Sequence, residues 1–178
     1  ANPPILIFSP ARRGKDNTTK HTLDNVLEVP EVVINMVDYD LVHACSLAST
    51  DYPQGVNEFE KAGLTEVPSV TITPPRVLES PVSMECKVLK VESFGPNPGA
   101  GNLVFCEIKR MHFRNNVLGS DGLPDADLLD LVARCGGSYY TRASKEALFE
   151  IPKPIANLGI GVDAIPKDIC TSSILTGK

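Results

Sequence analysis

Four cations gather in a short segment near the start of this chain, residues 9–22. They are Arg12, Arg13, Lys15 and Lys20. Against the single acid Asp16 they give the segment a net charge of +3, whereas the whole chain carries −5. Guanidinium, ammonium and hydroxyl groups beside a helix N-terminus are the partners that a phosphate group prefers. We therefore interpret the segment as a phosphate site, and a solvated surface loop remains the open alternative.

The rest of the sequence shows no second set of catalytic groups. His21, His43 and His112 lack the spacing of metal ligands. We expect His43 on an exposed helix face, whereas His112 is either a hydrogen-bonded core residue or a ligand contact at a barrel mouth. No G-x-S-x-G motif and no carboxylate pair stands out. A chain with an anion site but no acid, base or metal set is expected to take its chemistry from a cofactor.

The paired aromatic residues Tyr139 and Tyr140 follow a Gly-Gly turn signal. Two interpretations remain open for them. They either pack against the fold, or one ring flanks a flat ligand near the phosphate site.

Composition sets the class of protein. The chain has 178 residues, of which 42% are hydrophobic and 22% charged, which is ordinary for one globular domain. Fifteen prolines, thirteen glycines and no tryptophan favour short strands and many turns. A net charge of −5 argues against general nucleic-acid binding, because that binding neutralises many phosphates. One compact phosphate fits the local positive charge better.

The cysteines and the apolar runs bear on the compartment. Five scattered cysteines with no C-x-x-C pair predict reduced thiols and a cytoplasmic protein. No apolar run is long enough to cross a membrane and no signal peptide is visible. The chain opens on Ala1 without a methionine, and it ends at Lys178 with no stop to its last sequence pattern. We therefore expect that natural N- and C-terminal segments are missing.

Hydrophobic periodicity predicts the elements that must position these residues. Strands are predicted over 5–8, 31–37, 82–89 and 104–113. Short helices are predicted over 22–28, with Thr22 as N-cap, over 40–48, capped by Asp40, over 56–61, closed by Gly63, and over 125–132. Strand alternation predicts that Glu85 lies on the exposed face of 82–89 and that Arg110 and His112 share a face of 104–113 with Ile108. Cys86 and Cys106 are predicted to be small core residues. The two longest strands should form an antiparallel hairpin. The fold class is therefore mainly β, an antiparallel barrel with short peripheral helices.

Several sequence segments resemble the flavin reductase-like family of FMN-binding split barrels. They are NPPILIFSPARR at 2–13, KHTLDN at 20–25, YPQGVNEFEKAGLT at 52–65, PPRVLESPV at 74–82, ECK at 85–87, RCGGSYY at 134–140 and GVDAIP at 161–166. The resemblance covers nearly the whole chain in order. It implies a six-stranded, Greek-key-like split β-barrel spanning residues 1–178 as one domain, and family members carry upstream strands that this chain lacks.

The same resemblance implies a cofactor, a partner and site residues. FMN would lie at the interface of a homodimer, with its phosphate near Ser9, Arg12, Arg13, Lys20 and Thr22 and with Asn25 close by. Positions matching Lys61, His112 and Tyr140 approach the flavin or the partner subunit in similar proteins.

Three functions follow as expectations. The leading one is an NAD(P)H:flavin oxidoreductase, an enzyme that transfers hydride from NADH or NADPH to FMN. A non-catalytic, flavoredoxin-like electron carrier would use the same phosphate site. A nucleic-acid-binding barrel is disfavoured by the acidic charge and the few aromatic residues, and no membrane partner is expected.

Overall fold

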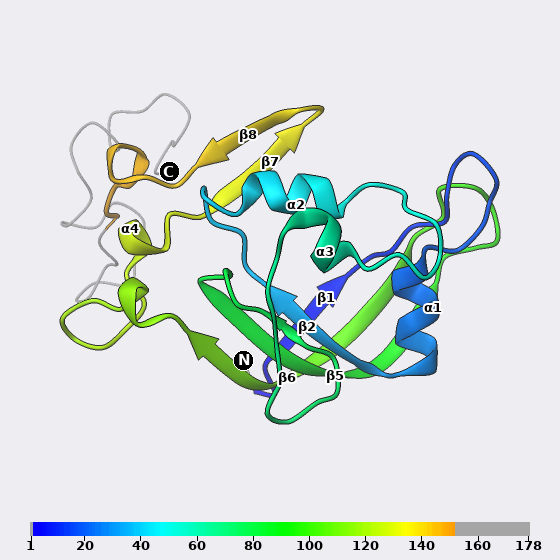
Figure 1. Cartoon of the computed structure of the whole chain (residues 1–178), viewed down its shortest axis with the longest axis horizontal. Coiled ribbons are helices and arrows are strands. Elements are labelled where there is room, and N and C mark those ends of the chain that lie inside the picture. The colour runs from blue at the N-terminus through cyan, green and yellow to red at the C-terminus, as the bar shows by residue number, and fades with distance from the viewer. Residues whose placement is uncertain (1, 152–178) are drawn as a thin grey trace, which may run out of the picture. The chain divides into compact units, whose positions relative to one another are not determined.

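A four-stranded antiparallel sheet forms the centre of the computed structural model, which describes residues 2–151 (Figure 1). In spatial order its strands are β1 (Ile5–Phe8), β6 (Asn102–Phe113), β5 (Val82–Ser93) and β2 (Glu31–Asn35). The long β5–β6 hairpin confirms the predicted pairing of the two longest strands. The chain divides into two compact units, residues 1–144 and 145–178.

Short helices and two small hairpins complete the first unit. The helices are α1 (His21–Glu28), α2 (Val42–Ala48), α3 (Glu58–Ala62), α4 (Ala126–Leu129) and the 3₁₀ turn η1 (Asn115–Val117). The small hairpins pair β3 (Glu66–Val67) with β4 (Arg76–Val77) and β7 (Val132–Gly136) with β8 (Tyr139–Arg142). In the second unit the described residues form the 3₁₀ turn η2 (Lys145–Ala147). The GVDAIP segment at 161–166 and Cys170 lie outside the described residues.

The core lies on one face of the central sheet. Val104 and Cys106 of β6 and Cys86 of β5 are fully buried there, and Val26 of α1 packs against them. Burial raises the pKa of the Cys86 thiol to about 11, with a further contribution from Cys106. Both cysteines therefore act as small apolar core residues, as predicted. No described helix is long and apolar enough to span a membrane.

A β-bulge changes which residues of β6 share a face. The register pairs Cys86 with Ile108 but Glu85 with Arg110, so one residue of β6 is skipped. The sequence prediction placed Arg110 and His112 on the same face as Ile108, and that is wrong. The skipped residue turns the end of β6 over, so that His112 lies on the side of Glu85.

Two predicted helix caps are also wrong. Helix α1 begins at His21, its N-cap is Lys20, and no side chain caps it, so Thr22 lies in its first turn. The N-cap of α2 is Leu41 and not Asp40, and no side chain caps this helix. The carboxylate of the buried Asp38 accepts the backbone N–H of Leu41 at 2.9 Å. Arg114 also donates to that carboxylate at 2.8 Å, which keeps a buried charge paired.

The helix predicted over 125–132 is shorter than expected, because Asp130 adopts a left-handed conformation with φ of 45°. Asp125 caps the remaining turn by accepting the N–H of Asp127 and Leu128. The chain then enters the β7–β8 hairpin, which periodicity did not predict. By contrast, the left-handed cap predicted at Gly63 is confirmed.

Candidate functional site

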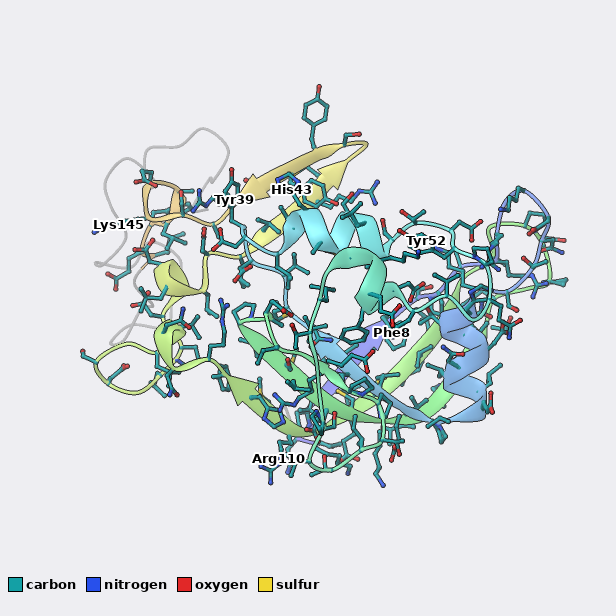
Figure 2. All side chains as sticks on the ribbon, in the orientation of Figure 1. Phe8, Tyr39, His43, Tyr52, Arg110 and Lys145 are labelled. Atoms are coloured by element: carbon teal, nitrogen blue, oxygen red, sulfur yellow. The ribbon has the colours of Figure 1, made fainter. Side chains whose placement is uncertain are left out.

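The basic segment forms one wall of a cleft of about 650 Å³. The opposite wall is the segment that follows α2, where Tyr52 lies (Figure 2). The charged residues that line the cleft are Arg12, Arg13, Lys15, Lys20, Asp51 and Glu58. His21 and Thr22 of α1 complete the lining on the side of the helix. Residues distant in sequence thus meet at the cations that the sequence singled out.

The basic segment is fixed to the tip of the β5–β6 hairpin. The backbone N–H of Arg12 donates to the carbonyl of Ala100 at 2.9 Å, and the side chain of Asn102 donates to the carbonyl of Pro10 at 2.9 Å. Asn17 donates to the carbonyl of Pro96 at 2.8 Å. These bonds hold a loop that contains no regular structure of its own.

Each of the two arginines donates two hydrogen bonds to other residues of this loop. Arg12 Nε donates to Asn17 Oδ1 at 2.8 Å, and Arg12 Nη2 donates to the carbonyl of Asn17. Arg13 Nη1 donates to Thr18 Oγ1 at 3.1 Å and to the carbonyl of Thr19. The guanidinium groups therefore shape the loop, and their positive charge still faces the cleft.

Asp51 pairs two cations across the cleft. Its carboxylate accepts Arg13 Nε at 3.0 Å and Lys15 Nζ at 2.5 Å. The hydrogen bond from Lys15, followed by that from Arg13, lowers the pKa of Asp51, and the bond to Asp51 raises the pKa of Lys15. An anionic ligand in this cleft would compete with Asp51 for the same two groups.

Lys20 differs from the other cations of the segment. Within the described part of the chain its ammonium group has no hydrogen bond or ion pair, although the side chain lines the cleft. It stands at the N-cap of α1, where the first backbone N–H groups of a helix lack internal partners and carry partial positive charge. A free ammonium beside free amides is an arrangement that binds a phosphate.

An apolar groove of about 850 Å³ continues from the basic cleft. The two share Thr22, Ala48 and Glu58 among their lining residues. The apolar lining includes Phe8, Val26, Val32, Ile34, Phe59 and Leu64, and the loop before β4 adds Pro74 and Pro75. Asn25 lies in the same groove and offers an amide to a polar atom of a ligand. Phe8 is labelled in Figure 2.

A third cleft, of about 470 Å³, lies between α2 and the β7–β8 hairpin. It shares Ser49 with the basic cleft, and Tyr140 lines it. His43, predicted on an exposed helix face, is exposed and also lines this cleft.

Glu85 is a charged residue that the sequence analysis placed on an exposed strand face. That prediction is wrong, because the loop before β4 covers this face and Glu85 is fully buried. Its carboxylate accepts the N–H of Val70 at 2.8 Å, the N–H of Thr71 at 2.7 Å and the hydroxyl of Thr71 at 2.5 Å. His112 Nε2 lies 2.7 Å away. Of the two interpretations of His112, the structure thus shows a hydrogen-bonded residue.

The predicted site residues fall into separate places. Arg12, Arg13, Lys20 and Thr22 line the basic cleft, Thr22 and Asn25 line the apolar groove, and Tyr140 lines the third cleft. Ser9, Lys61 and His112 line none of these three. His21 and Asp51 line the basic cleft and were not predicted as site residues. The sequence pointed to His21 only through its position next to Lys20, and nothing in it pointed to Asp51. Among the described residues, no group of three His, Cys, Asp or Glu side chains is placed to hold a metal.

The antiparallel sheet and its peripheral helices, beside which a basic cleft opens into an apolar groove, are those of a mainly β split barrel. Comparison with known proteins agrees. The model of the flavin reductase like domain matches residues 1–139, and the chain belongs to this family. The family name points to flavin-related redox chemistry.

Individual relatives extend the match. A protein of Aquifex aeolicus that is itself uncharacterized is 33% identical over 149 residues, which is 84% of this chain and 74% of the relative. Nitrilotriacetate monooxygenase component B from Bacillus cereus has a TM-score of 0.75 at 27% identity, covering 84% of this chain and 73% of that one. A protein of Shewanella frigidimarina, described as a flavin reductase with a split barrel domain, has a TM-score of 0.71 at 26% identity, covering 85% and 72%.

Proposed function

We propose that this chain binds FMN and acts as an NAD(P)H-dependent oxidoreductase of the flavin reductase kind. The observation that carries the proposal is the continuity of the basic cleft with the apolar groove through Thr22. FMN has one terminal phosphate joined by a polar chain to a flat, largely apolar ring. The two cavities offer these surroundings in that order.

The residues present fit such a ligand. Lys20 and the free amides at the start of α1 would hold the phosphate, and the charges of Arg12 and Arg13 add to the attraction. A charge-assisted hydrogen bond of this kind contributes about 1.5–3 kcal/mol. Phe8 and Phe59 line the groove in which the ring would lie.

When bound, FMN supplies the redox chemistry, for which this chain needs no acid–base pair of its own. The protein's part is to bind, orient and shield. The apolar walls of the groove would cover part of the ring, and Asn25 would give one polar contact that orients it. Holding two reactants in a fixed geometry is itself a large contribution to rate.

A homodimer with FMN at the subunit interface is part of the proposal. The groove is open to one side, and exposed apolar side chains such as Leu78 and Val70 lie on loops next to its proline-rich wall. A second copy that covers this opening would complete the shielding. Light scattering of the purified protein gives the mass that tests this point.

Titration with FMN and with riboflavin tests the phosphate assignment. Lys20→Gln should weaken FMN binding by at least about tenfold, because it removes one charge-assisted bond. Riboflavin lacks the phosphate, so its affinity should stay the same. Lys109→Gln, which alters an ion pair on β6 with Glu107, is the matched control and should change neither. Equal loss of both ligands in Lys20→Gln would contradict the assignment.

Oxidation of NADH and NADPH by the FMN-loaded protein then separates two functions. Turnover with either nucleotide supports the oxidoreductase. A holoprotein that neither nucleotide reduces, but that a chemical reductant does, is a flavoredoxin-like electron carrier. A protein that binds no flavin at all would refute both.

A further inference from the structure

The third cleft has the chemistry of a nucleotide site. It lies between α2 and the β7–β8 hairpin, in the region where Tyr39 and His43 are labelled in Figure 2. The hairpin is fixed there by backbone bonds: Val132 N–H donates to Val37 at 3.2 Å, and Tyr39 N–H donates to Asp130 at 3.0 Å. A volume of about 470 Å³ is within the usual range of small-molecule sites.

Its charge is positive. Arg134 and Arg142 line the cleft, and the described residues of the lining include no aspartate or glutamate. Arg142 is held by Asp130 through Nε at 2.6 Å and Nη2 at 2.7 Å. Arg134 is held through Nε and Nη2 by the carbonyl of Gly137, the shorter bond being 2.9 Å. Each guanidinium is thus positioned by two of its nitrogens, and among residues 2–151 its Nη1 has no hydrogen-bond partner and can bind a ligand.

Two aromatic rings stand beside these cations. Tyr39 and Tyr140 are 47% and 46% exposed, so each ring is half available for stacking. The guanidinium of Arg142 lies 3.9 Å from the centre of the Tyr39 ring, which keeps that ring in place. Flat rings next to arginines with a free nitrogen suit a purine base that carries a phosphate.

The third cleft also continues from the proposed flavin site. Ser49 lines both it and the basic cleft, whereas the third cleft and the apolar groove have no lining residue in common. The order along the protein is therefore apolar groove, basic cleft, cationic aromatic cleft. We propose that the third cleft binds the adenosine phosphate half of a dinucleotide, an inference that rests on the proposed flavin site.

Two ligands carry that half. In FAD it would extend directly from the phosphate in the basic cleft, and in NADH or NADPH it would arrive with the electron donor. Of the two ligands, FAD is favoured by the continuity of the three cavities, because one FAD molecule would then occupy all three. The shared chemistry is an adenine ring on Tyr39 or Tyr140 with a phosphate at Arg134 or Arg142.

The test compares ligands with and without the adenosine phosphate. FMN, FAD and adenosine diphosphate are titrated against the wild type, Tyr140→Ala and Arg134→Ala, and KM and kcat are measured for NADH and NADPH. Tyr139→Ala is the matched control, since Tyr139 is 79% exposed and does not line the cleft. All variants lie on an exposed hairpin, and thermal melting checks that they stay folded.

We expect both cleft variants to lose at least about fivefold in FAD affinity, the lower end for one stacking contact, with FMN affinity unchanged. If NAD(P)H supplies the adenosine phosphate, the KM for NADH or NADPH rises in both cleft variants, whereas kcat and the affinity for FAD are unchanged. Unchanged FAD, adenosine diphosphate and NAD(P)H parameters in both variants would overturn the proposal. If the wild type does not bind FMN, only the proposed flavin site is refuted. Binding of adenosine diphosphate that depends on Tyr140 would still support the proposal for the third cleft.

Discussion

Replacing Glu85 by glutamine tests whether one buried carboxylate holds the loop that walls the apolar groove. Glu85 is fully buried and binds the backbone at Val70 and Thr71, in the stretch that leads to Pro74 and Pro75. Arg76 Nε lies 3.8 Å from the same carboxylate. Glutamine has nearly the shape of glutamate, but its amide NH₂ would face N–H and O–H groups that are themselves donors. At least one buried polar group therefore loses its hydrogen-bond partner.

The structure sets the size of the effect. Burial alone raises the pKa of Glu85, but the hydrogen bonds from the Thr71 hydroxyl, the Val70 and Thr71 amides and His112 outweigh it and lower the pKa from 4.5 to about 2. At about 1.4 kcal/mol per pKa unit, the ionised carboxylate contributes about 3 kcal/mol to stability. A typical domain has a total of about 5–15 kcal/mol, so the loss should be easy to detect.

The sign of the pH dependence follows from the direction of the shift. Because the folded-state pKa lies below the unfolded-state value of 4.5, the stabilisation is complete above about pH 4.5. It is lost as the pH falls from there through about 2. Wild type and Glu85→Gln should therefore differ most near neutral pH and converge in acid.

Thermal melting across this pH range is the assay. Glu85→Gln should lower the midpoint by about 6–12 °C near neutral pH, from about 2–4 °C per kcal/mol for a chain of this size. Glu92→Gln, on the same strand but 51% exposed and paired with Lys90, is the matched control and should change the midpoint little. Parallel pH profiles for Glu85→Gln and wild type would refute the argument that the ionised carboxylate is the stabilising form.

Three further predictions rest on single contacts. Asp51→Asn frees Arg13 and Lys15, so FMN should bind severalfold more tightly in titration while riboflavin does not; weaker FMN binding would contradict the competition. Alkylation followed by peptide mapping should label the exposed Cys135 and spare the buried Cys86 until the protein unfolds. Gly63→Ala places a side chain at φ of 67° and should cost about 1 kcal/mol in a denaturant titration, and an unchanged midpoint would count against the strained cap.

The sequence was sufficient for features that depend on local pattern. The alternation along β5 and β6 predicted the hairpin, and Gly63 predicted the end of α3. The cations of residues 9–22 located the basic cleft, because charge and helix start lie close together in the sequence. Each of these signals lies within about a dozen residues.

The errors have a common cause in contacts that are distant along the chain. Glu85 alternates with apolar residues as an exposed strand residue does, and only the covering by a loop some fifteen residues away buries it. A one-residue bulge that no composition marks brings His112 to the same carboxylate. The helix predicted over 125–132 ends early because Asp130 turns to pair with Arg142 from β8. In each case a tertiary partner overrides a local preference.

The basic segment shows what a cluster of charges in a sequence does and does not indicate. Its four cations predict an anion site, but they do not say which of them is available. In the structure Arg12 and Arg13 bind their own loop and Lys15 pairs with Asp51, so that Lys20 is the cation with no competing partner among the described residues. Binding of the phosphate should therefore depend most on Lys20. In the sequence Lys20 was the least conspicuous of the four cations, because it lies five residues from the nearest other one.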